Sequence, residues 1–279
     1  ARAEFTKYDY DNNASVGRSG RFIRVADRID NFLTITPKAS LSYNFDNKNM
    51  IYFRAARGSR APQVSDLYSV QQNQVAGEAE IETLDSLELG FKGKISIFDA
   101  EFSAYTMWKD NFFFRNSNGF NVVNGKTRHQ GIEISFMGYL TDWVSISGDG
   151  TWAKHTYSFN EIIGSNANNI ISGSRVDSAP DTLAHMRLSF LPTVSNKIEL
   201  EWRHMGGYFT NPGNTNKYPG HNIFITRFTY AFDENIKLFG RVDNIFDKKY
   251  ADRADYAFGN ERYFPGRPRT LFFGLSTSF

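Results

Sequence analysis

Glu199, Glu201 and Arg203 form the most regular group of ionisable side chains, because they occupy every second position of one segment. Neighbouring carboxylates perform acid–base chemistry in some hydrolases. No catalytic motif accompanies these two carboxylates, since the chain has neither a nucleophile elbow nor a phosphate-binding glycine loop. We therefore interpret the group as part of a solvated wall, and we do not expect an enzyme.

Histidine and cysteine offer no metal site. The chain has no Cys, which excludes disulfides, thiolate chemistry and Cys-ligated zinc or iron–sulfur sites. The five histidines are scattered without metal-ligand spacing: His129, His155, His185, His204 and His221. His185 alternates in phase with Arg187, so we interpret it as a wall residue rather than a ligand. The sequence thus predicts no metal and no cofactor.

The composition is rich in aromatic residues but not hydrophobic overall. Aromatics make up 16% of the 279 residues, yet the mean hydropathy is −0.46. The formal net charge of +2 does not suggest a nucleic-acid partner. No segment approaches the roughly 18–20 consecutive apolar residues that a membrane-spanning helix needs. A helical membrane protein is therefore excluded.

The dominant pattern has a period of two residues. In 197–205 Ile198, Leu200 and Trp202 alternate with charged residues, and 37–45, 98–108, 144–152 and 271–279 alternate in the same way. Such alternation indicates strands with one wet face. About eleven strands are expected, near 34–45, 48–57, 84–93, 95–108, 127–140, 142–157, 181–191, 197–206, 222–232, 235–246 and 269–279. Most have the roughly 9–11 residues with which a tilted strand crosses a bilayer.

Short and long connections alternate along the chain. The short ones, near 46–48, 141–142, 193–196 and 233–235, are mostly rich in Asp and Asn, as tight hairpins are. The long ones are 58–83, 109–126, 158–180, 207–221 and 247–268. Outer-membrane barrels place short turns at one end and long loops at the other. We therefore predict an all-β protein, an antiparallel up-and-down transmembrane β-barrel with all five long loops at one end.

Several segments resemble the TonB-dependent outer-membrane receptors. They are TPKASLSY (36–43), YFRAARGSRAP (52–62), ETLDSLELG (82–90), NGKTRHQGIE (124–133), FGRVDNIFDKKY (239–250) and YFPGRPR (263–269). The last two, followed by a final strand that ends in Phe279, resemble the end of the family's barrel most closely. Phe279 also resembles the terminal aromatic signal that the barrel assembly machinery recognises.

The resemblance implies a barrel of about 22 strands around a plugged lumen. About 11–12 strands are expected here, with residues 1–12 as the end of a twelfth. The resemblance thus implies that 1–279 is the C-terminal half of the barrel. The N-terminal plug, the TonB box and a signal peptide would lie upstream, and contact with TonB would be made there.

In this family the ligand binds on extracellular loops and in the upper lumen. The resemblance implies a scarce nutrient, for which a ferric siderophore is our first expectation. Arg and aromatic residues suit an anionic, aromatic chelate. The ligand-binding candidates are the loop residues Arg57, Arg60, Tyr68, Phe113, Arg115, Arg175, Tyr208 and Tyr218.

Other interpretations stay open at this stage. A haem receptor is disfavoured, because Ser59 to Pro62 resembles the family's "FRAP" box but no His follows before Leu84. The alternatives are a passive porin or structural barrel, another cargo such as cobalamin or an oligosaccharide, and a soluble β-sandwich. The expected location is the bacterial outer membrane, with lipid and lipopolysaccharide as further partners.

Overall fold

Eleven strands form one antiparallel sheet. The computed structural model describes residues 1–13, 17–19, 22–71, 74–116, 119, 121–162 and 168–278. The strands of the large sheet pair strictly in chain order. They are β5 (Lys38–Asn44), β6 (Met50–Arg60), β7 (Glu82–Ile95), β8 (Phe98–Arg115), β9 (Asn121–Thr141), β10 (Val144–Tyr157), β11 (Thr182–Thr193), β12 (Asn196–Met205), β15 (His221–Ala231), β16 (Ile236–Asp243) and β19 (Thr270–Thr277). The up-and-down meander expected from the alternation is confirmed.

The remaining elements are short hairpins and one helix, apart from a further long pair. The long pair is β1 (Arg2–Tyr10) with β4 (Arg28–Thr36). The hairpins are β2 (Gly17–Ser19) with β3 (Phe22–Arg24), β13 (Tyr208–Phe209) with β14 (Lys217–Tyr218), and β17 (Ala251–Ala257) with β18 (Asn260–Pro265). The helix is α1 (Val64–Tyr68). Among the described residues, no helix has the length and apolar character needed to cross a membrane.

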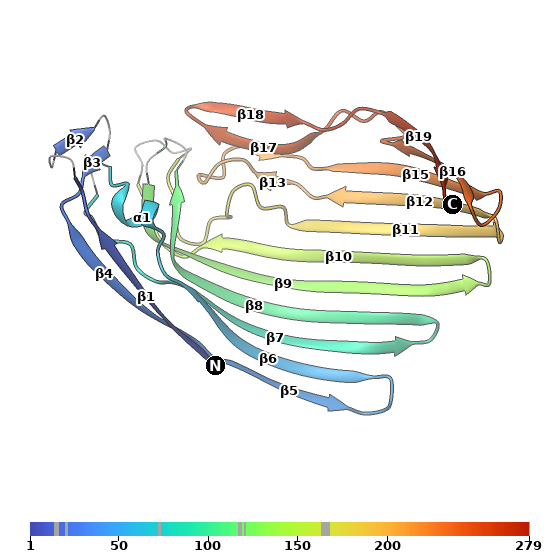
Figure 1. The fold of residues 1–279 in the computed structure, drawn as a ribbon, viewed down its shortest axis with the longest axis horizontal. Helices are drawn as coiled ribbons and strands as arrows, with labels where there is room; N and C mark the ends of the chain where they lie inside the picture. Colours follow the sequence, from blue (N-terminus) through green and yellow to red (C-terminus); the bar gives the residue numbers. More distant parts are fainter. Residues whose placement is uncertain are drawn as a thin grey trace.

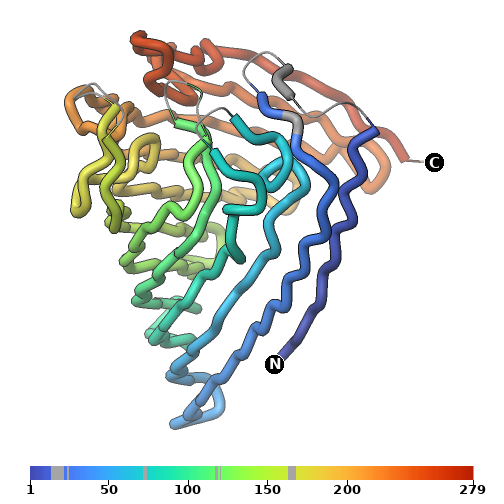
Figure 2. The backbone as a smooth tube through the Cα atoms, turned by 90° about the vertical axis from the view of Figure 1, so that its left-hand side faces the viewer, coloured from blue at the N-terminus to red at the C-terminus, as the bar shows by residue number. Residues whose placement is uncertain are grey.

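β4 and β5 follow one another with only Pro37 between them. The carbonyl of Pro37 accepts a hydrogen bond from the Arg57 amide of β6, at 3.0 Å. β1 therefore continues the meander beyond β4 as a twelfth strand, which agrees with the 11–12 strands expected. Figure 2 shows that the sheet curves into an open trough and does not close on itself.

The connections are divided between the two ends of the sheet as predicted. In Figure 1 the tight turns lie at the right-hand end, and the long loops with α1, β2–β3, β13–β14 and β17–β18 lie at the other. Asp side chains organise two of the turns. Asp46 accepts the amides of Lys48 and Asn49, at 2.7 and 2.8 Å, and Asp233 makes equivalent bonds in the turn before β16. These Asx-type bonds replace backbone pairing where the chain reverses.

The expected loop 109–126 is shorter than predicted. β8 and β9 have 18 and 21 residues and continue past the rest of the sheet. The register shifts between Lys109 and Phe112, where Asn111 has a positive φ of 58°. Gly125 faces Phe112 at this irregularity, and a Cβ on Gly125 would lie 2.7 Å from the ring. The bulge accommodates the residues at which the alternation of polar and apolar side chains breaks. The two strands therefore continue beyond the point where that alternation ends in the sequence.

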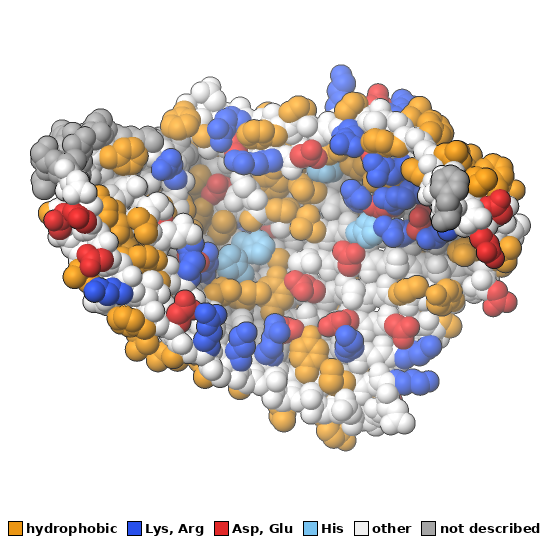
Figure 3. Space-filling model, viewed as in Figure 1, with side chains coloured by type: hydrophobic (Ala, Val, Ile, Leu, Met, Phe, Trp, Pro, Cys, Tyr) orange, Lys and Arg blue, Asp and Glu red, His pale blue; other side chains and the backbone are white. Residues whose placement is uncertain are grey.

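The alternation divides the sheet into an apolar and a charged face. Phe53, Leu89, Ala104, Ile132 and Trp152 lie directly opposite one another on β6 to β10, and the four large side chains are exposed. The charged side chains gather on the other face, which Figure 3 shows as the hollowed, concave side. The apolar row therefore belongs to the convex side.

The alternation predicted for β12 is confirmed, because its apolar side chains lie on the convex face and its charged side chains on the concave face. Leu200 is 46% exposed on the convex side, whereas Glu201 is only 2% exposed on the concave side. Hydrophobic cores are correspondingly small and lie at the loop end. One is formed by Leu67, Tyr68 and Ala79, and another by Tyr208, Tyr218, Ala251 and Ala254.

Candidate functional site

Glu201 is the centre of an ion network on the concave face. Its carboxylate contacts the guanidinium groups of Arg203 and Arg227. Arg187 Nη2 lies 3.5 Å from it and His185 Nε2 lies 3.3 Å from it. A carboxylate that is removed from water needs such partners, since burying it alone would be costly.

The register of three strands brings these residues together. Arg187 lies opposite Glu201, and His185 lies opposite Arg203. Arg227 lies opposite Glu199 on the other side, so it reaches Glu201 diagonally. Period-two alternation places all five side chains on one face, and the pairing then sets them side by side.

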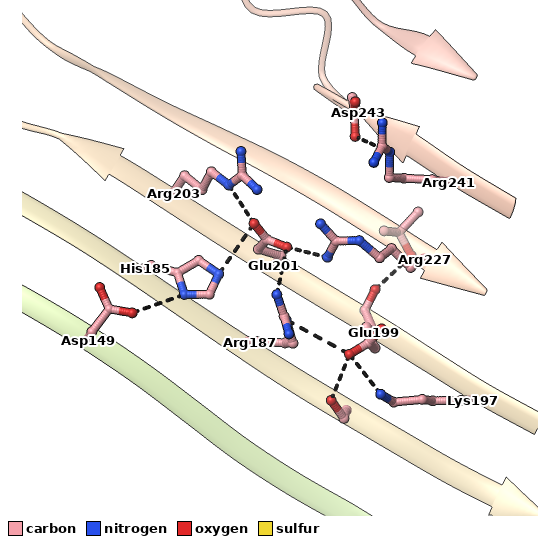
Figure 4. A network of polar contacts seen from close by, with 12 residues as sticks. Asp149, His185, Arg187, Lys197, Glu199, Glu201, Arg203, Arg227, Arg241 and Asp243 are labelled. Atoms are coloured by element: carbon pink, nitrogen blue, oxygen red, sulfur yellow. Dashed lines mark hydrogen bonds and ion pairs between the residues drawn. The ribbon is translucent and has the colours of Figure 1, made fainter. Parts of the chain in front are cut away.

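The network continues along the wall in both directions (Figure 4). His185 Nδ1 lies 3.2 Å from Asp149, and Lys197 Nζ lies 3.1 Å from Glu199. Arg241 lies opposite Arg227 and forms a separate ion pair, with its Nε 3.0 Å from Asp243. Besides His185, the ten labelled residues include five Arg or Lys and four Asp or Glu.

A second charged group lies nearer the loops. Glu82 binds both Arg60, at 2.8 Å, and Lys109, at 2.9 Å. Glu82 is thus shared by two cations. Phe113, half-buried, lines a small cavity together with Arg60 and Glu82. Asp66 and Glu80 line the same small cavity. Arg60 and Phe113 are thus the two predicted ligand residues that the structure brings together.

Arg115 and Arg175 lie in other loops. Arg115 is exposed, and its Nε lies 3.4 Å from the side-chain oxygen of Asn121. Arg175 donates to Asp181 at 2.9 Å, and its backbone amide donates to Asn214 at 2.7 Å. Arg115 is therefore the more available of the two for a ligand.

Arg57 lies on the opposite face from Arg60. It pairs with Asp85 through two hydrogen bonds of 2.6 and 2.5 Å. Asp85 lies opposite Trp108, in the phase of the convex apolar residues. Successive side chains of a strand point to opposite faces of the sheet, so two residues three positions apart cannot lie on the same face. We leave Arg57 out of the proposed ligand surface.

Three predicted tyrosines are structural in their contacts. Tyr68 is 7% exposed, stacks on Tyr10 with centroids 4.3 Å apart, and donates to Asp30 at 2.9 Å. Burial is the first cause that raises its pKa, to about 12. Tyr208 and Tyr218 are each 5% exposed and accept the backbone amides of Ala254 and Ala251. We therefore propose no ligand contact for these three rings.

His129 and His155 form a contact that was not expected from the sequence. Their Nδ1 atoms lie 2.7 Å apart on directly opposed positions of β9 and β10, and Thr127 lies 2.8 Å from His129 Nε2. Among the described residues no group of three or more His, Asp or Glu side chains is arranged to hold a metal. The alternation in the sequence could have predicted the face on which each histidine lies. Their contact could not be predicted, because it depends on the register between β9 and β10.

Carboxylates in the loops differ in their surroundings. Burial alone would raise the pKa of Asp255, but hydrogen bonds from Arg262 and Arg253 outweigh it and the pKa is lowered. Burial raises the pKa of Asp177, although Tyr157 donates a hydrogen bond to it at 2.5 Å. The predicted assembly residue Phe279 lies outside the described residues.

The sequence matches the model of the family described as TonB dependent receptor-like, beta-barrel, over residues 1–245. The chain belongs to this family. The resemblance inferred from the motifs is therefore confirmed, and the open trough is part of a TonB-dependent receptor barrel.

Solved structures with the same fold include three transport proteins. The ferric yersiniabactin uptake receptor FyuA from Yersinia pestis has a TM-score of 0.76 and 15% identity, with 92% of this chain and 39% of that chain covered. The ferric-catecholate import receptor Fiu from E. coli has a TM-score of 0.73 and 18% identity, with 99% of this chain and 41% of that chain covered. The copper transporter OprC has a TM-score of 0.73 and 17% identity, with 91% of this chain and 42% of that chain covered.

Identities this low establish the fold of a TonB-dependent receptor barrel and nothing finer. The chain spans about two-fifths of the length of these structures. These structural neighbours are transport proteins rather than enzymes, in keeping with the isolated setting of Glu199 and Glu201. Within the barrel, the concave face with its Glu201 network faces the lumen.

Proposed function

We propose that this chain is the C-terminal half of the barrel of an outer-membrane receptor that imports a ferric siderophore, with energy supplied through TonB. The family match carries this proposal, and the shared fold with FyuA and Fiu supports the cargo class. The plug and the TonB contact belong to the part of the receptor that precedes Ala1. Location in the bacterial outer membrane follows from the same proposal.

The charge of the lumen wall supports an anionic cargo. Around Glu201 five Arg and Lys side chains face four carboxylates, and Arg60 shares Glu82 with Lys109 in a cavity that Asp66 and Glu80 also line. A confined lumen screens charge less than bulk water does, so each unpaired cation attracts an anionic chelate more strongly there. Arg also offers a planar fork of donors and a stacking surface for aromatic chelators. Arg60, Phe113 and Arg115 are the proposed ligand residues.

Other functions share the fold. OprC is a copper transporter, so the barrel alone does not choose the cargo. Cobalamin and oligosaccharides remain alternative cargoes, and a passive porin would need neither plug nor TonB. A transport assay separates these possibilities.

The test is uptake by cells that express the complete receptor. Labelled ferric chelates, cobalamin, an oligosaccharide and copper are each offered, with and without an intact tonB gene. We expect ferric chelate uptake that stops without TonB. Uptake independent of TonB would support a porin, and TonB-dependent uptake of another cargo alone would overturn the siderophore assignment.

Arg60 allows a matched test of the binding surface. Arg60→Ala should weaken ferric chelate binding by about 1.5–3 kcal/mol, if it makes a charged hydrogen bond that the ligand buries. Arg57→Ala is the control, because it lies on the same strand, has one carboxylate partner and faces away. Equal affinities for the two variants would remove Arg60 from the site, provided that both barrels resist heat as the parent does.

A further inference from the structure

A row of four polar or charged residues and one tryptophan crosses the convex face on the loop side of its apolar part. Arg57, Asp85, Trp108, Arg128 and Thr156 lie directly opposite one another on β6, β7, β8, β9 and β10. The apolar row described above, from Phe53 to Trp152, lies four residues closer to the tight turns on each strand. The polar row thus marks the edge of the apolar face on the loop side.

Arg128 supplies a cation to this row that no acidic side chain of the described residues neutralises. Arg57 is paired with Asp85, but Arg128 forms no ion pair with any of the described residues and is exposed. Its guanidinium lies 5.7 Å from the centroid of the Trp108 ring. An indole beside an Arg at the edge of an apolar band is typical of a membrane interface.

Lys154 provides a second unpaired cation close by. It is exposed on β10, opposite Gln130 and diagonal to Arg128, and forms no ion pair within the described part of the chain. Lys126, two residues before Arg128, lies 3.7 Å from Asp110. Arg128 and Lys154 therefore form an exposed pair of positive charges with Trp108 at its side.

A shallow groove runs from the polar row into the apolar face. It has a volume of about 570 Å³, and Ala39, Ala55, Leu87 and Trp108 form its apolar part. Lys38, Arg57 and Asp85 line its polar part. The two alanines lie opposite each other on β5 and β6, where larger side chains would fill the space. An apolar chain can lie in this groove while a polar head stays at the row.

We propose that this surface binds a phosphorylated glycolipid of the outer leaflet, with a phosphate on Arg128 and Lys154 and an acyl chain in the groove. Guanidinium groups bind phosphate through two parallel charge-assisted hydrogen bonds, and Lys contributes a mobile charge. The apolar rows beneath would lie in the hydrocarbon, which sets the phosphate at the height of the head groups. This site faces away from the lumen and does not depend on the cargo.

Native mass spectrometry of the complete receptor in detergent tests the proposal. Lipid A is titrated against the parent, the Arg128→Ala/Lys154→Ala variant and a Lys94→Ala/Lys237→Ala control. The control removes two cations at the tight-turn ends of their strands, since Lys94 is next to last in β7 and Lys237 is second in β16. We expect the first variant to bind lipid A about tenfold more weakly or worse, since two charged contacts are lost, and the control to bind as the parent does.

Lipid A without phosphates provides a second measurement that needs no variant. The parent should bind it about tenfold more weakly than lipid A, because only the groove contacts remain. Equal binding of the two lipids by the parent would overturn the proposal. So would equal binding of lipid A by the parent and a folded Arg128→Ala/Lys154→Ala variant, with folding checked by heat-modifiable migration on gels.

Discussion

Replacing Glu201 by Gln should destabilise the barrel more than any other single charge removal on β12. The substitution keeps the shape of the side chain but leaves Arg187, Arg203 and Arg227 without their shared carboxylate. Removing one partner of a buried ion pair typically costs about 3–5 kcal/mol. The Arg203 side chain is 58% exposed, so its share is close to that of a surface pair, about 0–1 kcal/mol.

Arg227 dominates the expected loss, because its side chain is only 24% exposed. We therefore expect about 3 kcal/mol, the lower end of the range for buried pairs. That corresponds to a change of roughly a hundredfold in the unfolding equilibrium. Denaturant unfolding of the complete receptor in detergent, followed by tryptophan fluorescence, measures it.

Glu199→Gln is the matched control on the same strand. Its nearest cations are Lys197, at 3.1 Å, and Arg187, at 3.9 Å, and the Lys197 side chain is 46% exposed. We expect a loss of about 1 kcal/mol or less. Combining Glu201→Gln with Arg227→Gln should cost less than Glu201→Gln alone, because one unpaired charge is then removed. A Glu201→Gln barrel as stable as the parent, or a double variant weaker than the single one, would refute the reasoning.

Two further predictions concern the convex face and the loops. Leu200→Arg should cost roughly 2–4 kcal/mol near the bilayer midplane, measured by refolding into lipid vesicles, and a variant that folds as well as the parent would contradict the facing. The hairpin β17–β18 should open on acidification, because the pKa of Asp255 lies below its ordinary value of 3.8 in the folded state. Its stabilisation is present above that value and lost as the pH falls through the lowered pKa. Limited proteolysis should show faster cleavage of the hairpin below about pH 4, and Asp255→Asn should abolish this dependence.

Local sequence patterns were sufficient to predict the fold. Alternation in 197–205 gave both the strand and the face of each side chain, because a strand has a period of two. The segment at 46–49, with one Asp and two Asn, predicted a tight turn, since the Asp46 carboxylate satisfies backbone amides there. The bulge at Asn111 was missed, because a register shift depends on the neighbouring strand.

The candidate ligand residues were harder to predict. The opposite facing of Arg57 and Arg60 follows from their spacing of three, and alternation could have shown it. The burial of Tyr68 could not be foreseen, because it depends on Tyr10 and Asp30 from a distant hairpin. The partners of Glu201 likewise required the register between β11, β12 and β15.

The tyrosine contacts at the loop end join two long loops into one body. Tyr208 and Tyr218, from the β12–β15 loop, hold the backbone of β17, and Glu261 of β18 accepts a hydrogen bond from Thr210 at 3.0 Å. A displacement of either loop therefore carries the other with it. The exposed tip of the β17–β18 hairpin, at Phe258, bears none of these contacts. A fluorescent label placed there would report the motion of both loops while leaving the contacts between them intact.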